Sequence, residues 1–126
     1  MAGTIVADQL QDGAGNSTSM DNAIYGTAKA WVTWNGTTTP SITGSYNVSS
    51  VTRTALGNFT VTYTSALSTA NYSVSALCDS SSGGSFRVAM TNYGTPPSTT
   101  AVALVFGNTV NTTSYDPNLA SVIIIK

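Results

Sequence analysis

The sequence contains no histidine and no glutamate, and charged residues make up only 7% of its 126 positions. Four Lys or Arg stand against five Asp, which gives a formal net charge of −1. Without histidine, the chain lacks the usual general base at neutral pH and the commonest metal ligand. Four scattered cations provide no basic surface for a nucleic acid. We therefore expect no metal site, no bound cofactor and no nucleic-acid partner.

Long apolar segments are also missing. The longest apolar run near either end covers only residues 122–125, whereas a membrane-spanning helix needs about 20 residues. We therefore expect no membrane insertion.

Cysteine is nearly absent, because Cys78 is the only one and no disulfide can form within the chain. The N-terminus begins Met1-Ala2-Gly3-Thr4-Ile5 and shows no signal peptide. These two features predict folding in a reducing cytosol, although the hydroxyl-rich composition is typical of extracellular proteins. A component of a virus particle, assembled inside a cell and later exposed outside it, would satisfy both.

Catalysis requires groups that this chain mostly lacks. Its 38 Ser and Thr hydroxyls have no histidine beside them, and no Ser-x-x-Lys spacing occurs. A glycosidase needs two acids about 5–9 Å apart, but the five Asp are spread along the chain and mostly fall in expected loops. We expect that the protein is not an enzyme.

Alternation of apolar and polar residues with a period of two dominates the chain and predicts β-strands. Residues 58–64 are the clearest case, with Phe59, Val61 and Tyr63 on one face and three Thr on the other. Gly and Pro separate the segments. The pattern predicts an antiparallel β-sandwich of about seven to eight strands over residues 28–126. The expected strands are 28–35, 41–46, 48–53, 58–64, 71–77, 85–93, 100–108 and 120–125.

Two strands have apolar residues on both faces. Residues 100–108 alternate Val102, Leu104 and Phe106 with a second apolar row, so we expect cover on both sides. Residues 120–125 form one continuous apolar run, which is typical of a central strand or of a strand buried at a subunit contact. Ile123 and Ile125 in this run are candidate assembly contacts.

Residues 1–27 differ from the rest and are expected to form an extended attachment arm. Ile5, Val6 and Leu10 could form one short strand, but the polar stretch 11–19 has too few apolar groups to hold itself on the sandwich. These three residues are the candidate contacts of the arm with a partner subunit or a larger assembly.

The aromatic residues have two interpretations. Trp31 and Trp34 could stack on sugar rings, but tryptophans in a β-domain of this size more often lie in the core or at a subunit contact. Tyr93 and Tyr115 are flanked by loop residues, and loops commonly carry recognition. They are the candidate receptor contacts, unless they only cap the edge of the sandwich.

Four segments carry a resemblance to a known family, in order and spacing. They are Ala28-Lys29-Ala30-Trp31-Val32-Thr33-Trp34-Asn35-Gly36, Ser45-Tyr46-Asn47-Val48-Ser49-Ser50-Val51-Thr52, Gly57-Asn58-Phe59-Thr60-Val61-Thr62-Tyr63 and Ala70-Asn71-Tyr72-Ser73-Val74. This pattern resembles a module of tail-fibre and other surface proteins of tailed bacteriophages, cyanophages included. The chain departs from it at Trp34, where Phe is common, and at Thr33, where Asn is common.

The resemblance implies a homotrimeric virion surface protein that is assembled in the cytoplasm of a bacterial host. It implies a short tail fibre, spike or receptor-binding module that acts in host attachment and binds a host glycan or protein receptor. The alternative is a capsid decoration protein that stabilises the head through residues 1–27 and contacts other virion proteins there. An enzyme such as a polysaccharide depolymerase is the least favoured interpretation.

Overall fold

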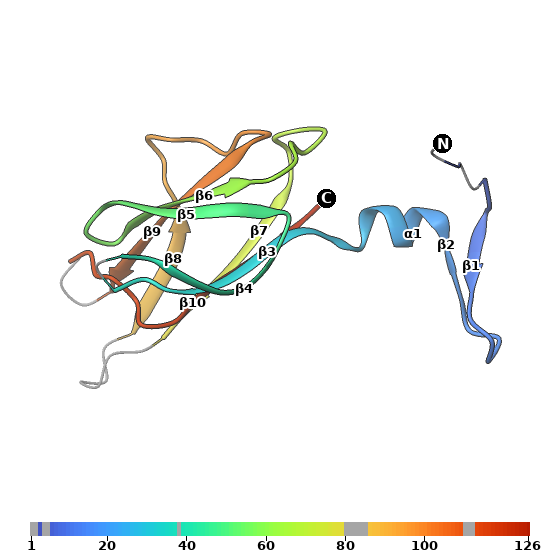
Figure 1. Ribbon diagram of the computed structural model, residues 1–126, viewed down its shortest axis with the longest axis horizontal. Helices are drawn as coiled ribbons and strands as arrows, with labels where there is room; N and C mark the ends of the chain where they lie inside the picture. The colour runs from blue at the N-terminus through green and yellow to red at the C-terminus, as the bar shows by residue number, and fades with distance from the viewer. Residues whose placement is uncertain (1–2, 4–5, 38, 80–85, 110–112) are drawn as a thin grey trace.

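The computed structural model of this protein describes residue 3 and residues 6–37, 39–79, 86–109 and 113–126. Two four-stranded antiparallel sheets pack face to face, and an arm leads into them from the N-terminus (Figure 1). The strands of the sandwich are β3 Ala28–Asn35, β4 Ser41–Tyr46, β5 Val48–Ala55, β6 Asn58–Tyr63, β7 Ser73–Cys78, β8 Arg87–Thr91, β9 Ala101–Asn108 and β10 Ala120–Ile125. The expected all-β antiparallel fold is confirmed.

The strand order is β4-β3-β10-β7 in the first sheet and β5-β6-β9-β8 in the second. The chain fills neither sheet in one pass, because β7 and β10 return to the first sheet after strands of the second. β10 lies between β3 and β7. Its continuous apolar sequence therefore belongs to a central strand, as one of the two interpretations predicted.

The core lies between the sheets and follows from the alternation. Trp34, Phe59 and Phe106 are buried, and their ring centroids are 5.6–6.1 Å apart in tilted or edge-to-face contacts. Such aromatic pairs add about 0.5–1.5 kcal/mol each beyond the burial of apolar area. Trp31 is an odd number of residues from Trp34, so it points to the opposite face of β3 and is 38% exposed.

β9 is apolar on both faces, and the two faces are covered differently. Val102, Leu104 and Phe106 enter the core. On the outer face, Ala103 is only 7% exposed and lies opposite Thr60 of β6. Side chains directly across a strand pair are close enough to cover a small neighbour. The second apolar row of β9 therefore consists mainly of small side chains between two flanking strands.

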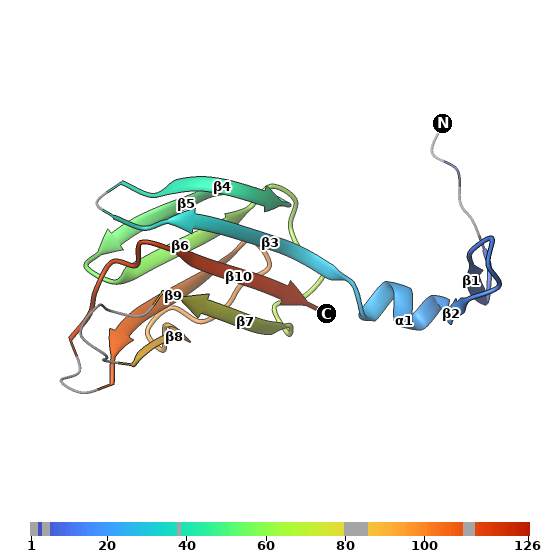
Figure 2. The same cartoon turned by 90° about the horizontal axis from the view of Figure 1, so that it is seen from below.

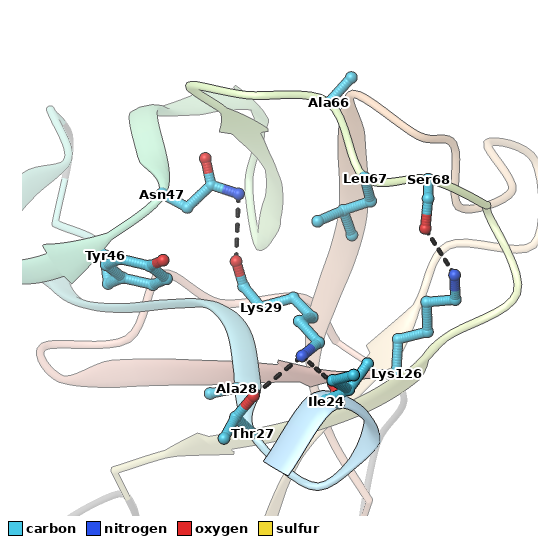
Figure 3. A pocket seen from close by; sticks show the side chains of 10 residues that line it. All are labelled: Ile24, Thr27, Ala28, Lys29, Tyr46, Asn47, Ala66, Leu67, Ser68 and Lys126. Atoms are coloured by element: carbon cyan, nitrogen blue, oxygen red, sulfur yellow. Dashed lines mark hydrogen bonds between the residues drawn. The ribbon is translucent and has the colours of Figure 1, made fainter. Parts of the chain in front are cut away.

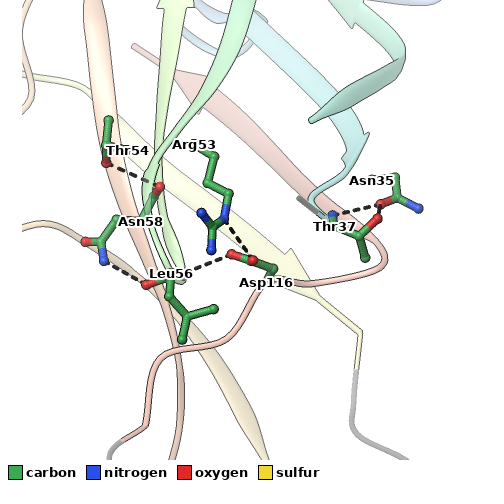
Figure 4. A network of polar contacts seen from close by, with 8 residues as sticks. Asn35, Thr37, Arg53, Thr54, Leu56, Asn58 and Asp116 are labelled. Atoms are coloured by element: carbon green, nitrogen blue, oxygen red, sulfur yellow. Dashed lines mark hydrogen bonds and ion pairs between the residues drawn. The ribbon is translucent and has the colours of Figure 1, made fainter. Parts of the chain in front are cut away.

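Asp116, in the segment before β10, is tied to strand β5 by an ion pair and to the turn after β5 by a hydrogen bond (Figure 4). Arg53 Nε lies 2.8 Å from Asp116 Oδ2, and Asp116 Oδ1 accepts a hydrogen bond from the Gly57 amide at 2.9 Å. Gly57 has a φ of +70°, and a Cβ there would lie 2.6 Å from the carbonyl oxygen of Phe106. Only glycine fits this turn.

The arm contains more local structure than the sequence predicted. β1 Gln9–Gln11 pairs with β2 Ser17–Ser19, and the helix α1 Met20–Tyr25 connects this hairpin to the sandwich. Figure 2 shows hairpin and helix projecting from one end of the sandwich. The short helix was not expected, because six residues are too few to produce a helical period in the sequence.

Candidate functional site

The arm is organised by its own polar groups. In the turn between β1 and β2, Asp12 Oδ1 accepts hydrogen bonds from the amides of Ala14 and Asn16, both at 2.9 Å. Asp12 Oδ2 accepts one from the Asn16 side chain at 2.8 Å. These bonds, the one from the Asn16 side chain above all, lower the pKa of Asp12. The turn is thus shaped without help from the sandwich.

Three apolar side chains of the arm are exposed to solvent. Val6 is 93% exposed, and Leu10 and Ile24 are each 49% exposed. Val6 and Leu10 were predicted as assembly contacts, and the structure leaves both available for one. Ile5, the third predicted contact of the arm, lies outside the described residues.

The outer face of the β4-β3-β10-β7 sheet carries a row of large apolar side chains. Trp31 pairs with Tyr46 on one side and with Ile123 on the other. Since Ala30, Val32, Val122 and Ile124 point into the core, these three residues point outward. Ile125 and Leu77 extend the patch, and Leu77 is 72% exposed. We call Trp31, Tyr46, Leu77, Ile123 and Ile125 the outer apolar face.

Charge is nearly absent from this sheet. Its four strands contain a single charged residue, Lys29. Gly44 of β4 lies beside the indole of Trp31, where an added Cβ would be 3.4 Å from the ring atom Cζ3. Ile123 and Ile125, the predicted assembly contacts, are 44% and 39% exposed, together with a tryptophan, on a sheet whose strands carry one charged residue, Lys29.

Asn47 forms the corner at which the chain passes from β4 in one sheet to β5 in the other. Its φ is 53°, a left-handed conformation that Asn tolerates better than most residues. Its side chain donates to the carbonyl oxygens of Lys29 at 3.0 Å and Ser65 at 3.2 Å and accepts from the Ser65 amide at 2.8 Å. This motif residue therefore has a structural role, because it connects the β4–β5 corner to Lys29 and Ser65.

A pocket of about 340 Å³ opens where the arm joins the sandwich. Figure 3 shows Tyr46 and Asn47 on one side of it and Leu67, Ser68 and Lys126 on the other. Lys29 Nζ donates to the carbonyl oxygen of Ile24 and to Thr27 Oγ1, and Lys126 Nζ donates to Ser68 Oγ. The sequence gives no sign that these two lysines line one pocket, because this depends on the pairing of β3 with β10.

Tyr93 and Tyr115, the predicted receptor contacts, are not brought together. Tyr93 follows β8 and is fully exposed, in a turn where Asn92 Oδ1 accepts a hydrogen bond from the Gly94 amide at 2.9 Å. Tyr115 lies at the other end of β8, where the guanidinium carbon of Arg87 is 3.6 Å from its ring centroid.

The surroundings of Tyr115 are those of a packed side chain. Its hydroxyl donates to the carbonyl oxygen of Asp79 at 3.3 Å, and burial is the main cause of the raised pKa of this phenol. Asp79 Oδ2 in turn lies 3.9 Å from Arg87 Nη1. Of the two tyrosines, Tyr93 alone presents its whole side chain to solvent.

Among the described residues, no group of three or more His, Cys, Asp or Glu side chains could hold a metal ion. In the same part of the chain, no helix has the length and apolar character needed to cross a membrane. Comparisons with protein-family models, with curated proteins and with solved structures find no match for this chain.

Proposed function

We propose that this protein lies on the surface of a tailed-bacteriophage particle, as a short tail fibre, spike or receptor-binding module that acts in host attachment. The proposal rests first on the arm. The arm precedes the sandwich in the chain, projects from it and exposes Val6, Leu10 and Ile24. These are the features of an attachment element. The resemblance of four motif segments to phage fibre modules supplies the type of particle.

The energetics of the arm support a partner. An isolated two-stranded hairpin is at best marginally stable in water, and a helix of six residues is far below the length that is stable alone. All described arm residues from 6 to 19 are exposed, so the sandwich contributes little to holding them. Another virion protein that covers Val6 and Leu10 would provide the missing burial.

Self-association is the second part of the proposal. The outer apolar face brings a tryptophan, a tyrosine and two isoleucines to one surface, and exposed patches of this kind commonly mark protein contacts. A homotrimer that buries Trp31, Ile123 and Ile125 and leaves Tyr46 on the edge strand β4 uncovered would use Ile123 and Ile125 as assembly contacts. It would leave Tyr93 free for a receptor on the host surface.

Locating the protein on the particle tests this function. Antibodies raised against residues 28–126 should label the tail or tail tips of virions from the phage that encodes the chain. The purified protein, added to host cells before infection, should reduce adsorption. Particles without label would overturn the proposal, and tail labelling without any block of adsorption would remove the receptor-binding part.

Capsid decoration is the second candidate, and the arm is also the observation that favours it. A preshaped hairpin followed by a short helix could insert between capsid subunits and stabilise the head. Labelling confined to heads, together with heads that lose heat resistance when residues 1–27 are deleted, would favour decoration over attachment.

A further inference from the structure

We propose that the pocket at the arm–sandwich junction binds an acidic sugar, whose carboxylate or phosphate lies between Lys29 and Lys126. The proposal deepens the proposed role in host attachment and rests on it for the biological source of the sugar. The pocket's volume of about 340 Å³ falls within the range of small-molecule sites.

The positions of the two lysines follow from strand register. Ile125 of β10 pairs with Ala28 of β3, so Lys126 and Lys29, which follow these two residues, both lie near the end of the sheet where the pocket opens, and both line it. No aspartate lines the pocket. Among the described residues, the ion pairs are Arg53 with Asp116 and Arg87 with Asp79, and neither lysine ammonium takes part in one.

Donors remain for a ligand. An ammonium group has three N–H donors. Lys29 uses two of them, on Ile24 and Thr27, and Lys126 uses one, on Ser68. One donor on Lys29 and two on Lys126 are left to bind an anionic oxygen, and such charge-assisted hydrogen bonds are about twice as strong as neutral ones.

The rest of the lining favours a sugar over a bare anion. Tyr46 is 58% exposed and presents an aromatic ring on the side opposite Lys126 (Figure 3). Sugar rings pack their apolar C–H faces on such rings. The hydroxyls of Thr27 and Ser68 also line the pocket and can exchange hydrogen bonds with sugar hydroxyls.

Calorimetric titration of the purified full-length chain tests the site. The probes are trigalacturonic acid, galactose 6-phosphate, neutral galactotriose and inorganic phosphate, each to about 10 mM. We expect millimolar binding of one or both acidic sugars, weakened by added NaCl because salt screens the lysines. The tighter of the two acidic sugars identifies carboxylate or phosphate as the recognised group.

Variants separate the two parts of the site. Lys126→Gln should weaken binding of the acidic sugar at least tenfold, since it removes a charged donor, and its amide can still contact Ser68. Tyr46→Ala should weaken sugar binding and leave inorganic phosphate unaffected. Phe86→Ala is the matched control, because it removes an aromatic side chain that is 79% exposed and does not line the pocket, and it should bind like the wild type.

The proposal is overturned by absence of binding, by equal binding of galactotriose, by phosphate alone binding as tightly as the sugars, or by an unaffected Lys126→Gln variant. These outcomes do not depend on where the protein resides. Particles that carry the protein but show no sugar binding would refute the pocket alone, and sugar binding by a chain absent from particles would refute the attachment role alone.

Discussion

Asn47 Nδ2 donates a 3.0 Å hydrogen bond to the carbonyl oxygen of Lys29 and so ties the corner between the two sheets to the first strand of the sandwich. The same amide binds Ser65 through both its oxygen and its nitrogen. One side chain therefore joins three separate parts of the chain at a position where φ is positive.

Substitutions at Asn47 should separate the contribution of its side-chain hydrogen bonds from that of its left-handed backbone conformation. Asn47→Ala loses the hydrogen bonds and places an alanine in the left-handed region, so we expect a loss of about 2–4 kcal/mol in the free energy of unfolding. Asn47→Gly loses the same bonds but tolerates the backbone, and should be about 1 kcal/mol more stable than the alanine variant. Urea denaturation measures both. Equal stabilities would show that backbone strain contributes nothing.

Asp116 should make the protein sensitive to acid. Burial alone would raise the pKa of this carboxyl, but hydrogen bonds from Arg53 and the Gly57 amide outweigh burial and hold the pKa below its ordinary value. The stabilisation is thus fully present above the unfolded-state pKa near 3.8 and is lost as the pH falls through the lower folded-state pKa.

Thermal unfolding between pH 6 and pH 2 tests this expectation. Asp116→Asn should lower stability at pH 6 by about 1–2 kcal/mol. The stability of this variant should then decrease less as the pH falls from 6 to 2. If the stability of the variant falls as steeply with decreasing pH as that of the wild type, another carboxyl causes the acid sensitivity.

Tyr63 should make the stability of the protein fall as the pH rises in the alkaline range. Burial, and then the hydrogen bond to Tyr72, raise the pKa of its phenol, and the two hydroxyl oxygens are 3.0 Å apart. A raised folded-state pKa stabilises the protein below the unfolded-state value near 10, and this contribution is lost as the pH rises further. Tyr63→Phe should reduce the fall in melting temperature above pH 10. The part of the fall that persists is assigned to Tyr115, whose pKa is also raised. An unchanged alkaline limb would contradict this assignment.

The outer apolar face should control self-association. We expect the wild-type chain to be a trimer by light scattering, and the double variant Trp31→Ser, Ile123→Ser to be smaller in mass, because it removes two large apolar side chains from an exposed surface. Leu56→Ser is the matched control, since Leu56 is 53% exposed in the turn between β5 and β6. A wild-type monomer at micromolar concentration would exclude the trimer.

Removing the arm should leave the sandwich intact. The described residues 6–19 bury little surface, so a chain of residues 28–126 should unfold within about 1 kcal/mol of the full-length protein. The same truncation should abolish association with particles if the arm is the attachment element. Chemical denaturation measures the first effect and co-sedimentation with virions the second. A truncated protein that still joins particles would disprove attachment through the arm.

The strands of the sandwich could be predicted because alternation and Gly/Pro breaks are local properties of the sequence. The continuous apolar run in β10 also indicated a central strand. Strand order could not be predicted, because β7 and β10 pair with distant parts of the chain. The pocket depends on that order, since the pairing of Ala28 with Ile125 places Lys29 and Lys126 in the lining of one pocket.

The structure of the arm could not be predicted from the sequence for a different reason. Its hairpin is shaped by one carboxylate, Asp12, which bonds three donors within four residues, and polar stretches of this kind resemble ordinary loops in sequence. The short helix α1 is held at its end by Lys29, which donates to the carbonyl of Ile24. Such contacts leave no periodic signal.

The position of β3 has a mechanical consequence. The arm continues directly into Ala28, and β3 is hydrogen-bonded to β4 on one side and to β10 on the other. A pull on the arm acts along β3, whereas the ladder bonds run perpendicular to it. The two ladders must then fail together in shear rather than unzip one bond at a time, so the junction of arm and sandwich is built to resist load.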